Sequence, residues 1–154
     1  MDRFLAMFQN SYLTVALSSW FVAQVIKTIL YAILNGRINW ERLFGDGGMP
    51  SGHSATVASL ATLAGLIHGL DSFEFAIAAV LAIIVCHDAM GVRLETGKQA
   101  QLINEMQKIV EILSKKELPE VKLKEFVGHT PMQVLAGITI GILNATIIYF
   151  VFLA

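Results

Sequence analysis

The sequence predicts an all-α integral membrane protein, a bundle of about four transmembrane helices plus one amphipathic helix. Apolar residues make up 55% of the 154 residues and charged residues only 15%, whereas a typical soluble domain has about 25% charged residues. The mean hydropathy of +0.64 points the same way. So much apolar surface fits lipid better than water. The length suits one domain, and we expect residues 1–154 to form a single membrane domain.

Four apolar segments supply the expected spans, at residues 11–34, 54–70, 73–88 and 132–153. A bilayer core about 30 Å thick needs about 20 helical residues. The first and fourth segments meet this length. The second and third are shorter and are separated by only a few residues, so we interpret them as a helical hairpin.

Residues 94–116 differ from these spans, because apolar side chains recur there every three or four positions among lysines and glutamates. The apolar positions are Leu102, Ile103, Met106, Ile109, Val110 and Leu113. This period predicts an amphipathic helix that lies on the membrane or against the bundle. Inside the spans, Gly65 and Gly69 are four residues apart, as are Gly137 and Gly141. Such pairs favour close helix packing in lipid, and a homodimer is one outcome we expect them to permit.

Lysine and arginine lie almost entirely on one side of the expected topology. Four spans place both termini and the loop at Asp71 together, on a side whose only basic residue is Arg3. The other side holds Arg37, Arg42, Arg93, Lys98, Lys108, Lys115, Lys116, Lys122 and Lys124. Cytoplasmic loops of membrane proteins are enriched in such residues. We therefore expect this second side to be cytoplasmic, in a cell membrane, with both termini outside.

Two histidines fall where two spans begin. His53 ends the run Gly-Gly-Met-Pro-Ser-Gly-His at residues 47–53, and His129 is followed by Thr130 and Pro131, which read as the N-cap and first residue of a helix. Helix N-termini bind anions through free backbone N–H groups and the positive end of the helix dipole. The topology places both histidines on the same side of the membrane.

Charged residues converge on that side. Lys27 lies two turns before the end of the first span, Arg37 follows it, and Asp88 and Arg93 follow the third. A charge inside a span is costly and usually functional. Two histidines, three cations and two helix starts together predict a site for phosphate or a similar oxyanion. One imidazole would attack phosphorus and the other would protonate the leaving oxygen.

The motifs resemble those of a known family. Pro-Ser-Gly-His at residues 50–53 resembles the central motif of type 2 phosphatidic-acid phosphatases and vanadium haloperoxidases, and His-Thr-Pro-Met-Gln-Val-Leu-Ala-Gly at residues 129–137 resembles their last motif. With Gly-Gly-Met at 47–49, Asp-Ala-Met-Gly-Val-Arg at 88–93 and Gln-Ala at 99–100, the chain is most similar to the divergent bacterial branch of small membrane proteins. The resemblance covers about residues 27–141.

The resemblance implies a role for each matched residue. His129 would be the nucleophile that forms a phosphohistidine, and His53 the general acid. Ser51 and the Gly52 amide would hold phosphate oxygens, and Lys27 would correspond to the lysine of the first motif. The implied reaction needs no metal and no cofactor.

This sequence departs from the family pattern in three places. Leu34 and Asn35 stand where the first motif has Arg-Pro, with Arg37 nearby as a substitute. Residues 122–123 are Lys-Leu where the last motif has Ser-Arg, and Arg93 or Lys124 could supply that charge. Gln133 replaces the aspartate that orients the nucleophilic histidine, and Asp88 is the other candidate for that role.

The leading expectation is a membrane-embedded hydrolase for a phosphomonoester or diphosphate of a lipid, such as phosphatidate, phosphatidylglycerol phosphate or a polyprenyl diphosphate. A second is a non-catalytic binder or carrier of phosphorylated lipid, which needs only the cations and the helix starts. A third is a structural membrane partner, in which the polar cluster organises the bundle. The net charge of −1 provides no overall basic field for nucleic acid.

Overall fold

The described part of the chain is all-α, as expected. The computed structural model describes residues 9–37, 40, 47–114, 123 and 127–154. Their helices are α2 (Ser11–Asn35), α3 (Gly52–His68), α4 (Phe73–Met90), α5 (Val92–Ser114) and α6 (Pro131–Ile148), which continues into the π-helical segment η2 (Tyr149–Leu153).

Three stretches are long and apolar enough to cross a membrane: α2, α4 continued by α5, and α6 continued by η2. Helix α3 has 17 residues, about 26 Å at 1.5 Å per residue, and is shorter than these. It nevertheless lies at the centre of the bundle, where it packs against α2, α4 and α6. The expected set of about four spans therefore consists of three qualifying helices around a shorter central one.

Polar side chains define where three of these helices begin. The Asn10 side chain accepts hydrogen bonds from the first backbone N–H groups of α2. Ser51 Oγ accepts one from Ser54 N at 3.3 Å at the start of α3, and Ser72 Oγ accepts one from Phe75 N at 3.1 Å at the start of α4. Each cap satisfies an N–H that has no partner inside its helix.

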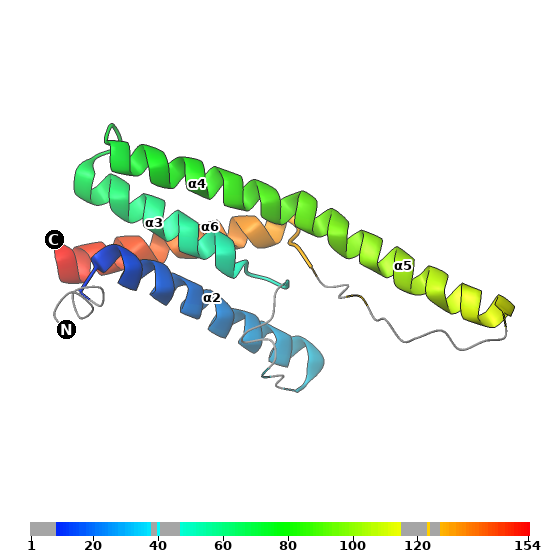
Figure 1. The fold of residues 1–154 in the computed structure, drawn as a ribbon. Helices are drawn as coiled ribbons and strands as arrows, with labels where there is room; N and C mark the ends of the chain where they lie inside the picture. Colours follow the sequence, from blue (N-terminus) through cyan, green and yellow to red (C-terminus); the bar gives the residue numbers. More distant parts are fainter. Residues whose placement is uncertain (1–8, 38–39, 41–46, 115–122, 124–126) are drawn as a thin grey trace, which may run out of the picture.

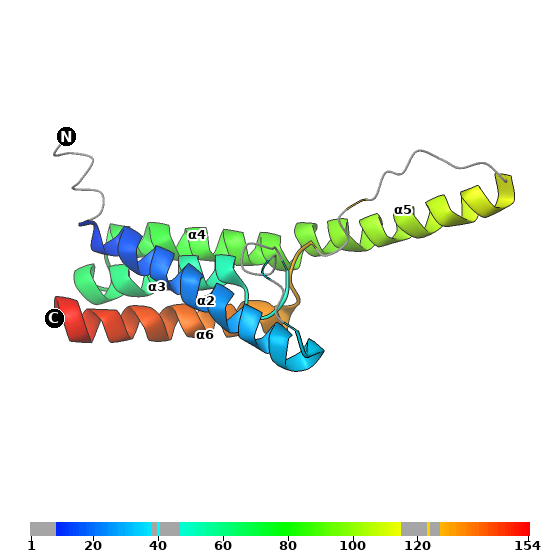
Figure 2. The same cartoon turned by 90° about the horizontal axis from the view of Figure 1, so that it is seen from below.

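The helices run alternately up and down the bundle (Figure 1). The starts of α3 and α6 and the ends of α2 and α4 share one end of the bundle, as the view in Figure 2 also shows. The α3–α4 turn, the start of α2 and the end of η2 lie at the opposite end. Both histidine-bearing helix starts are therefore at the same end of the molecule.

Helices α3 and α6 pack with almost no space between their backbones. A Cβ atom at Gly137 would lie 2.3 Å from the Ser51 carbonyl oxygen, and one at Gly141 would lie 2.3 Å from that of Ala55. The expected packing role of this glycine pair is confirmed. The contact is made within one chain, so homodimerisation stays a prediction that these two glycines do not support.

A polar contact joins α6 to α2 inside the bundle. The Asn144 amide donates to Ser18 Oγ at 2.9 Å and to Ser19 Oγ at 2.8 Å. Hydrogen bonds of this kind between helices contribute roughly 0.6 kcal/mol each in lipid. They fix the rotation of α6 relative to α2.

Only the first turns of helix α5 lie against the bundle, where Leu94, Lys98 and Gln101 line a pocket with Gln133 of α6. Helix α5 begins directly after Gly91, close to the direction of α4, and projects beyond the other helices (Figures 1 and 2). The amphipathic helix therefore contacts the bundle along its first turns only, and its position on a membrane surface stays a prediction. Along α5, the buried Asn104 binds both the N–H and the C=O of Leu123, at 3.1 and 3.0 Å.

Candidate active site

The two motif histidines lie side by side at the end of the bundle where α3 and α6 begin. The ring centroids of His53 and His129 are 6.2 Å apart, with an angle of 61° between the ring planes. His53 is exposed on the first turn of α3, whereas His129 is only 3% exposed. The structure thus brings together one accessible and one buried imidazole from distant parts of the chain.

The backbone around His129 is held by the junction between α4 and α5. The His129 N–H donates to the Ala89 carbonyl at 2.9 Å. The preceding Gly128 has a φ of +84°, and a Cβ atom there would lie 2.3 Å from Leu94 N. Only glycine fits this approach without strain. Gly128 therefore allows the backbone at His129 to pack against the junction between α4 and α5.

Gln133 determines which nitrogen of His129 carries the proton. Its Oε1 accepts a hydrogen bond from the Thr130 N–H at 3.1 Å. The amide nitrogen could not accept this bond, so the amide oxygen must occupy this position. The same Oε1 lies 3.3 Å from His129 Nδ1, so Nδ1 must be the donor. In the neutral imidazole, Nε2 then keeps its lone pair.

Ser51 joins the two helix starts. Its N–H donates to the Gln133 carbonyl at 3.0 Å, which connects the start of α3 to the first turn of α6. Its fully buried side chain caps α3 and lies 3.0 Å from Ser54 Oγ. The serine expected to bind phosphate thus holds the scaffold of the site together.

Helix α2 covers the start of α3 with a row of polar side chains. A Cβ atom at the buried Gly52 would lie 3.1 Å from Trp20 Cδ1 and 3.8 Å from Gln24 Cδ. The Lys27 side chain is 4% exposed and passes over the loop before α3, because a Cβ atom at Gly48 would lie 3.6 Å from Lys27 Cγ and Cδ. The expected lysine is therefore brought to the site.

The surroundings of His129 favour its neutral form. Burial is the largest influence and lowers the pKa of the imidazole below 6.5. The charges of Lys27 and His53 lower the pKa further, whereas hydrogen bonds to Gln133 and to the Gly48 backbone raise it. With the pKa lowered overall, His129 is mostly neutral at pH 7, the state a nucleophile requires.

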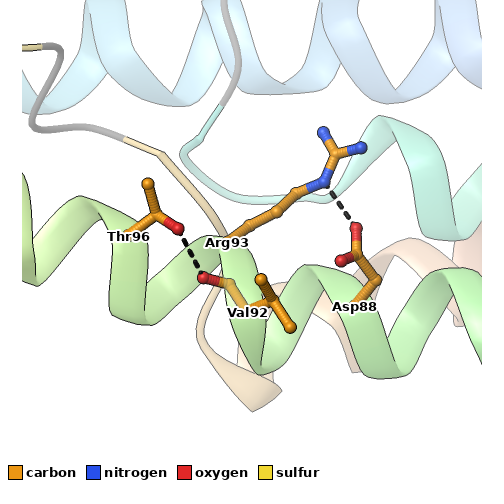
Figure 3. A network of polar contacts seen from close by, with 4 residues as sticks. All are labelled: Asp88, Val92, Arg93 and Thr96. Atoms are coloured by element: carbon orange, nitrogen blue, oxygen red, sulfur yellow. Dashed lines mark hydrogen bonds and ion pairs between the residues drawn. The ribbon is translucent and has the colours of Figure 1, made fainter.

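Asp88 and Arg93 pair with each other at the α4–α5 junction. Arg93 Nε lies 2.6 Å from Asp88 Oδ2, with 48% and 42% of their side chains exposed. Figure 3 shows the guanidinium reaching back from the start of α5 to the last turn of α4. The Asp88 carboxylate thus holds Arg93, and Gln133 is the residue at His129 Nδ1. The expected role of Asp88 in orienting His129 has no support in this geometry.

Arg37 follows the last residues of α2, after Gly36, and is exposed. Among the described residues, none of the contacts around the histidines involves Arg37. Its expected role as a phosphate ligand stays a prediction. Lys124 and the Lys-Leu pair at 122–123 lie outside the described residues, apart from Leu123.

Two features of the site were missed by sequence reasoning. Gln24 is 5% exposed, and its Oε1 has no hydrogen-bond partner among the described residues. The spacing of Trp20, Gln24 and Lys27 places all three on one face of a helix and could have indicated it.

In addition, a pocket of about 190 Å³ adjoins Gly48 and Gln133 and is lined by Lys98 and Gln101 of α5. No sequence pattern indicated that pocket, because it depends on the angle at Gly91.

Comparison with known proteins agrees with this geometry. A family model described as the divergent PAP2 family, PAP2 denoting type 2 phosphatidic-acid phosphatase, matches residues 8–144. The chain belongs to this family. The matched region of this divergent PAP2 protein includes both histidines, Lys27 and Gln133, and the resemblance found in the sequence is confirmed.

A curated relative is the uncharacterized membrane protein YuiD of Bacillus subtilis (strain 168), which is 37% identical over 155 residues, covering 94% of this chain and 97% of the relative. The likeness to this relative, together with the apolar helices, supports a membrane location. No solved structure matches the chain.

Proposed function

We propose that the protein is a membrane-embedded phosphatase that hydrolyses a phosphomonoester or diphosphate of a lipid through a phosphohistidine. The observation that carries this proposal is the pair of imidazoles, His53 and His129, with ring centroids 6.2 Å apart at the starts of two helices. At this separation both imidazoles can contact one phosphoryl group bound beside them.

In the proposed reaction, His129 Nε2 attacks phosphorus while its Nδ1–H stays bonded to Gln133 Oε1. The bond between phosphorus and the ester oxygen breaks, and the leaving oxygen takes a proton from His53. Water then attacks the phosphohistidine and gives a proton back to His53. Inorganic phosphate leaves, and both imidazoles return to their starting states. Every step uses groups of this chain, with no metal or cofactor.

Two kinds of group would hold the phosphate oxygens. The N-termini of α3 and α6 offer backbone N–H groups and the positive ends of their dipoles. The Lys27 ammonium group supplies a full positive charge, and its side chain passes over the loop before α3, 3.6 Å from where a Cβ atom at Gly48 would lie. Arg93, held by Asp88, lies at the adjacent helix junction and is a candidate for a further contact. The negative charge of the transition state would be stabilised by these groups.

The position of the site favours a lipid substrate. The histidines lie at one end of an apolar bundle, where α3 and α6 begin (Figure 1). A headgroup at the membrane surface would reach this position while its chains stay in the bilayer. The excess of lysine and arginine on this side places the site at the cytoplasmic face in our proposal, so the substrate would be presented in the inner leaflet.

The test is phosphate release by the purified protein in liposomes, against a panel of phosphorylated lipids. His129→Ala and His53→Ala are compared with His68→Ala, a histidine at the opposite end of the bundle. We expect release by the wild type and by His68→Ala, with losses of at least about 100-fold in the other two variants. Release unaffected by His129→Ala would contradict the proposal.

A second candidate function is a non-catalytic binder of phosphorylated lipid. The observation that favours it is Gln133, because an amide cannot stabilise an imidazolium as a carboxylate can. In serine proteases, replacing the aspartate beside the catalytic histidine by its amide costs about 10⁴ in kcat. If vanadate or phosphate raises the melting temperature but no lipid releases phosphate, the binder becomes the better description.

A further inference from the structure

An apolar groove of about 700 Å³ runs along the bundle. Ala58, Ala61 and Gly65 of α3 line it, together with Ala79 and Ala82 of α4 and Ile142 of α6. Helices α4 and α6 each pack against α3 but contact each other much less. The groove is therefore the space between α4 and α6, and its floor is hollow because the α3 side chains there are small.

The groove begins close to the catalytic histidines. Cys86 lies at its near end, one helical turn before Ala89, and the Ala89 carbonyl accepts the His129 N–H at 2.9 Å. On α6, the lining residue Ile138 follows Gln133 by little more than one turn. A molecule bound in the groove would thus have one end next to the site.

The far end of the groove lies near the opposite end of the bundle. Phe75 and Leu70 line it near the α3–α4 turn. Along α4, the rise between the lining residues Cys86 and Phe75 is about 17 Å at 1.5 Å per residue. Half of a bilayer core is about 15 Å. The groove therefore continues past the bilayer midplane, beyond the depth of one leaflet.

We propose that this groove binds an apolar chain of the phosphorylated lipid whose headgroup is at His53 and His129, and that it selects a chain long enough to pass the midplane. The inference rests on the proposed function and adds the substrate class. Its basis is continuity with the site, the apolar lining and the depth. A helix from a second copy is the competing occupant, and the test below separates the two.

The test measures binding, so it does not depend on turnover. The probes are eicosyl phosphate and butyl phosphate, which share a headgroup and differ in chain length, and the readout is the melting temperature of the detergent-solubilised protein as each probe is titrated. We expect the wild type to bind eicosyl phosphate at least tenfold more tightly. Equal affinity for the two probes would overturn the chain site.

Two substitutions on α6 form a matched pair. Ile142→Trp narrows the groove, whereas Ile147→Trp adds the same side chain outside it; the two isoleucines are 44% and 59% exposed, so neither change disturbs a core. We expect Ile142→Trp to weaken the binding of eicosyl phosphate about tenfold and to leave the binding of butyl phosphate unchanged. Ile147→Trp should change neither affinity. Equal effects of the two variants would overturn the proposal.

A second pair on α4 repeats the test from the other wall. Ala79→Leu fills the groove, and Ala76→Leu, on an exposed face of the same helix, is the control. If the groove variants instead convert a dimer to a monomer without changing chain-length preference, a second copy is the occupant. Preferential binding of eicosyl phosphate without phosphate release would support the groove as a chain-binding site and would contradict the proposed phosphatase activity. No binding of either probe would overturn both.

Discussion

His129 Nδ1 lies 3.3 Å from Gln133 Oε1, one helical turn along the chain, and the same oxygen accepts the Thr130 N–H at 3.1 Å. One amide thus orients the His129 imidazole and satisfies the N–H of Thr130, the N-cap of α6. The family resemblance implies aspartate at this position. The amide keeps the geometry of such a contact but provides no negative charge.

Gln133→Glu should therefore increase turnover. The side chain keeps its length, so both hydrogen bonds can persist, and its carboxylate would stabilise the imidazolium form of His129. We expect kcat for the best lipid to rise about tenfold or more, with the acid limb of the pH profile moved to higher pH, because a nearby negative charge raises the pKa of His129. Gln133→Leu, which removes both contacts, should lower kcat. An unchanged pH profile in Gln133→Glu would contradict this role.

The stability of the fold should fall in mild acid because of His129. Its pKa is lowered in the fold by burial, so the unfolded chain takes up a proton there first as pH decreases. The contribution is fully present above the unfolded pKa of about 6.5 and is lost as pH falls from that value toward the folded pKa. The melting temperature should drop less between pH 8 and pH 5 in His129→Asn than in the wild type. His68→Asn serves as the control, and equal drops in all three proteins would argue against a buried neutral imidazole.

The contact between α3 and α6 should be intolerant of a methyl group. Gly137→Ala and Gly141→Ala each place a Cβ 2.3 Å from a backbone oxygen, and backbone can give way only by separating the helices. We expect each to destabilise the fold by roughly 1–3 kcal/mol. At Gly65, the nearest atom to a new Cβ is Leu70 Cδ2 at 2.9 Å, the end of a flexible side chain. Gly65→Ala should therefore cost less, as measured by thermal unfolding in detergent.

Gly128 should matter for both stability and catalysis. Gly128→Ala combines a φ of +84° with a contact of 2.3 Å to Leu94 N, so it must displace His129 from the helix junction. Gly36→Ala is a matched control, because Gly36 has a φ of +65° but no neighbouring atom within 4 Å of a new Cβ. At Gly36, we expect the strained φ alone to lower the free energy of unfolding by about 1 kcal/mol. At Gly128, we expect a larger loss of stability together with at least tenfold lower kcat. Equal behaviour of the two variants would argue against this constraint on His129.

The sequence predicted the parts of the fold that local patterns encode. The start of α6 followed from Thr130 and Pro131. Close packing of the last span followed from the spacing of Gly137 and Gly141, although that spacing did not indicate which helix it meets. Both histidines could be placed at one end of the bundle, because each stands at the start of an apolar segment and alternate spans must return to the same side. Lys27 was recognised because a charge inside a span is rarely accidental.

Contacts that depend on the angles between helices could not be predicted. Asp88 was a candidate to orient His129, but the α4–α5 junction turns its carboxylate to Arg93, five residues later. The junction also directs α5 away from the bundle, although its amphipathic pattern was equally compatible with packing on it. Gln24 is a polar residue within the otherwise mostly apolar segment at 11–34. Its approach to Gly52 depends on how α2 crosses α3, which no periodicity specifies.

In the proposed mechanism, His129 becomes phosphorylated during turnover, so that intermediate should be trappable. Protein incubated with a ³²P-labelled lipid phosphate would be denatured rapidly in alkali, where phosphohistidine survives, and the label would be located by peptide mapping. We predict alkali-stable, acid-labile label on the peptide containing His129, none in His129→Ala, and full labelling in the His68→Ala control. Phosphate release that continues in His129→Ala, or label on another residue, would contradict the account.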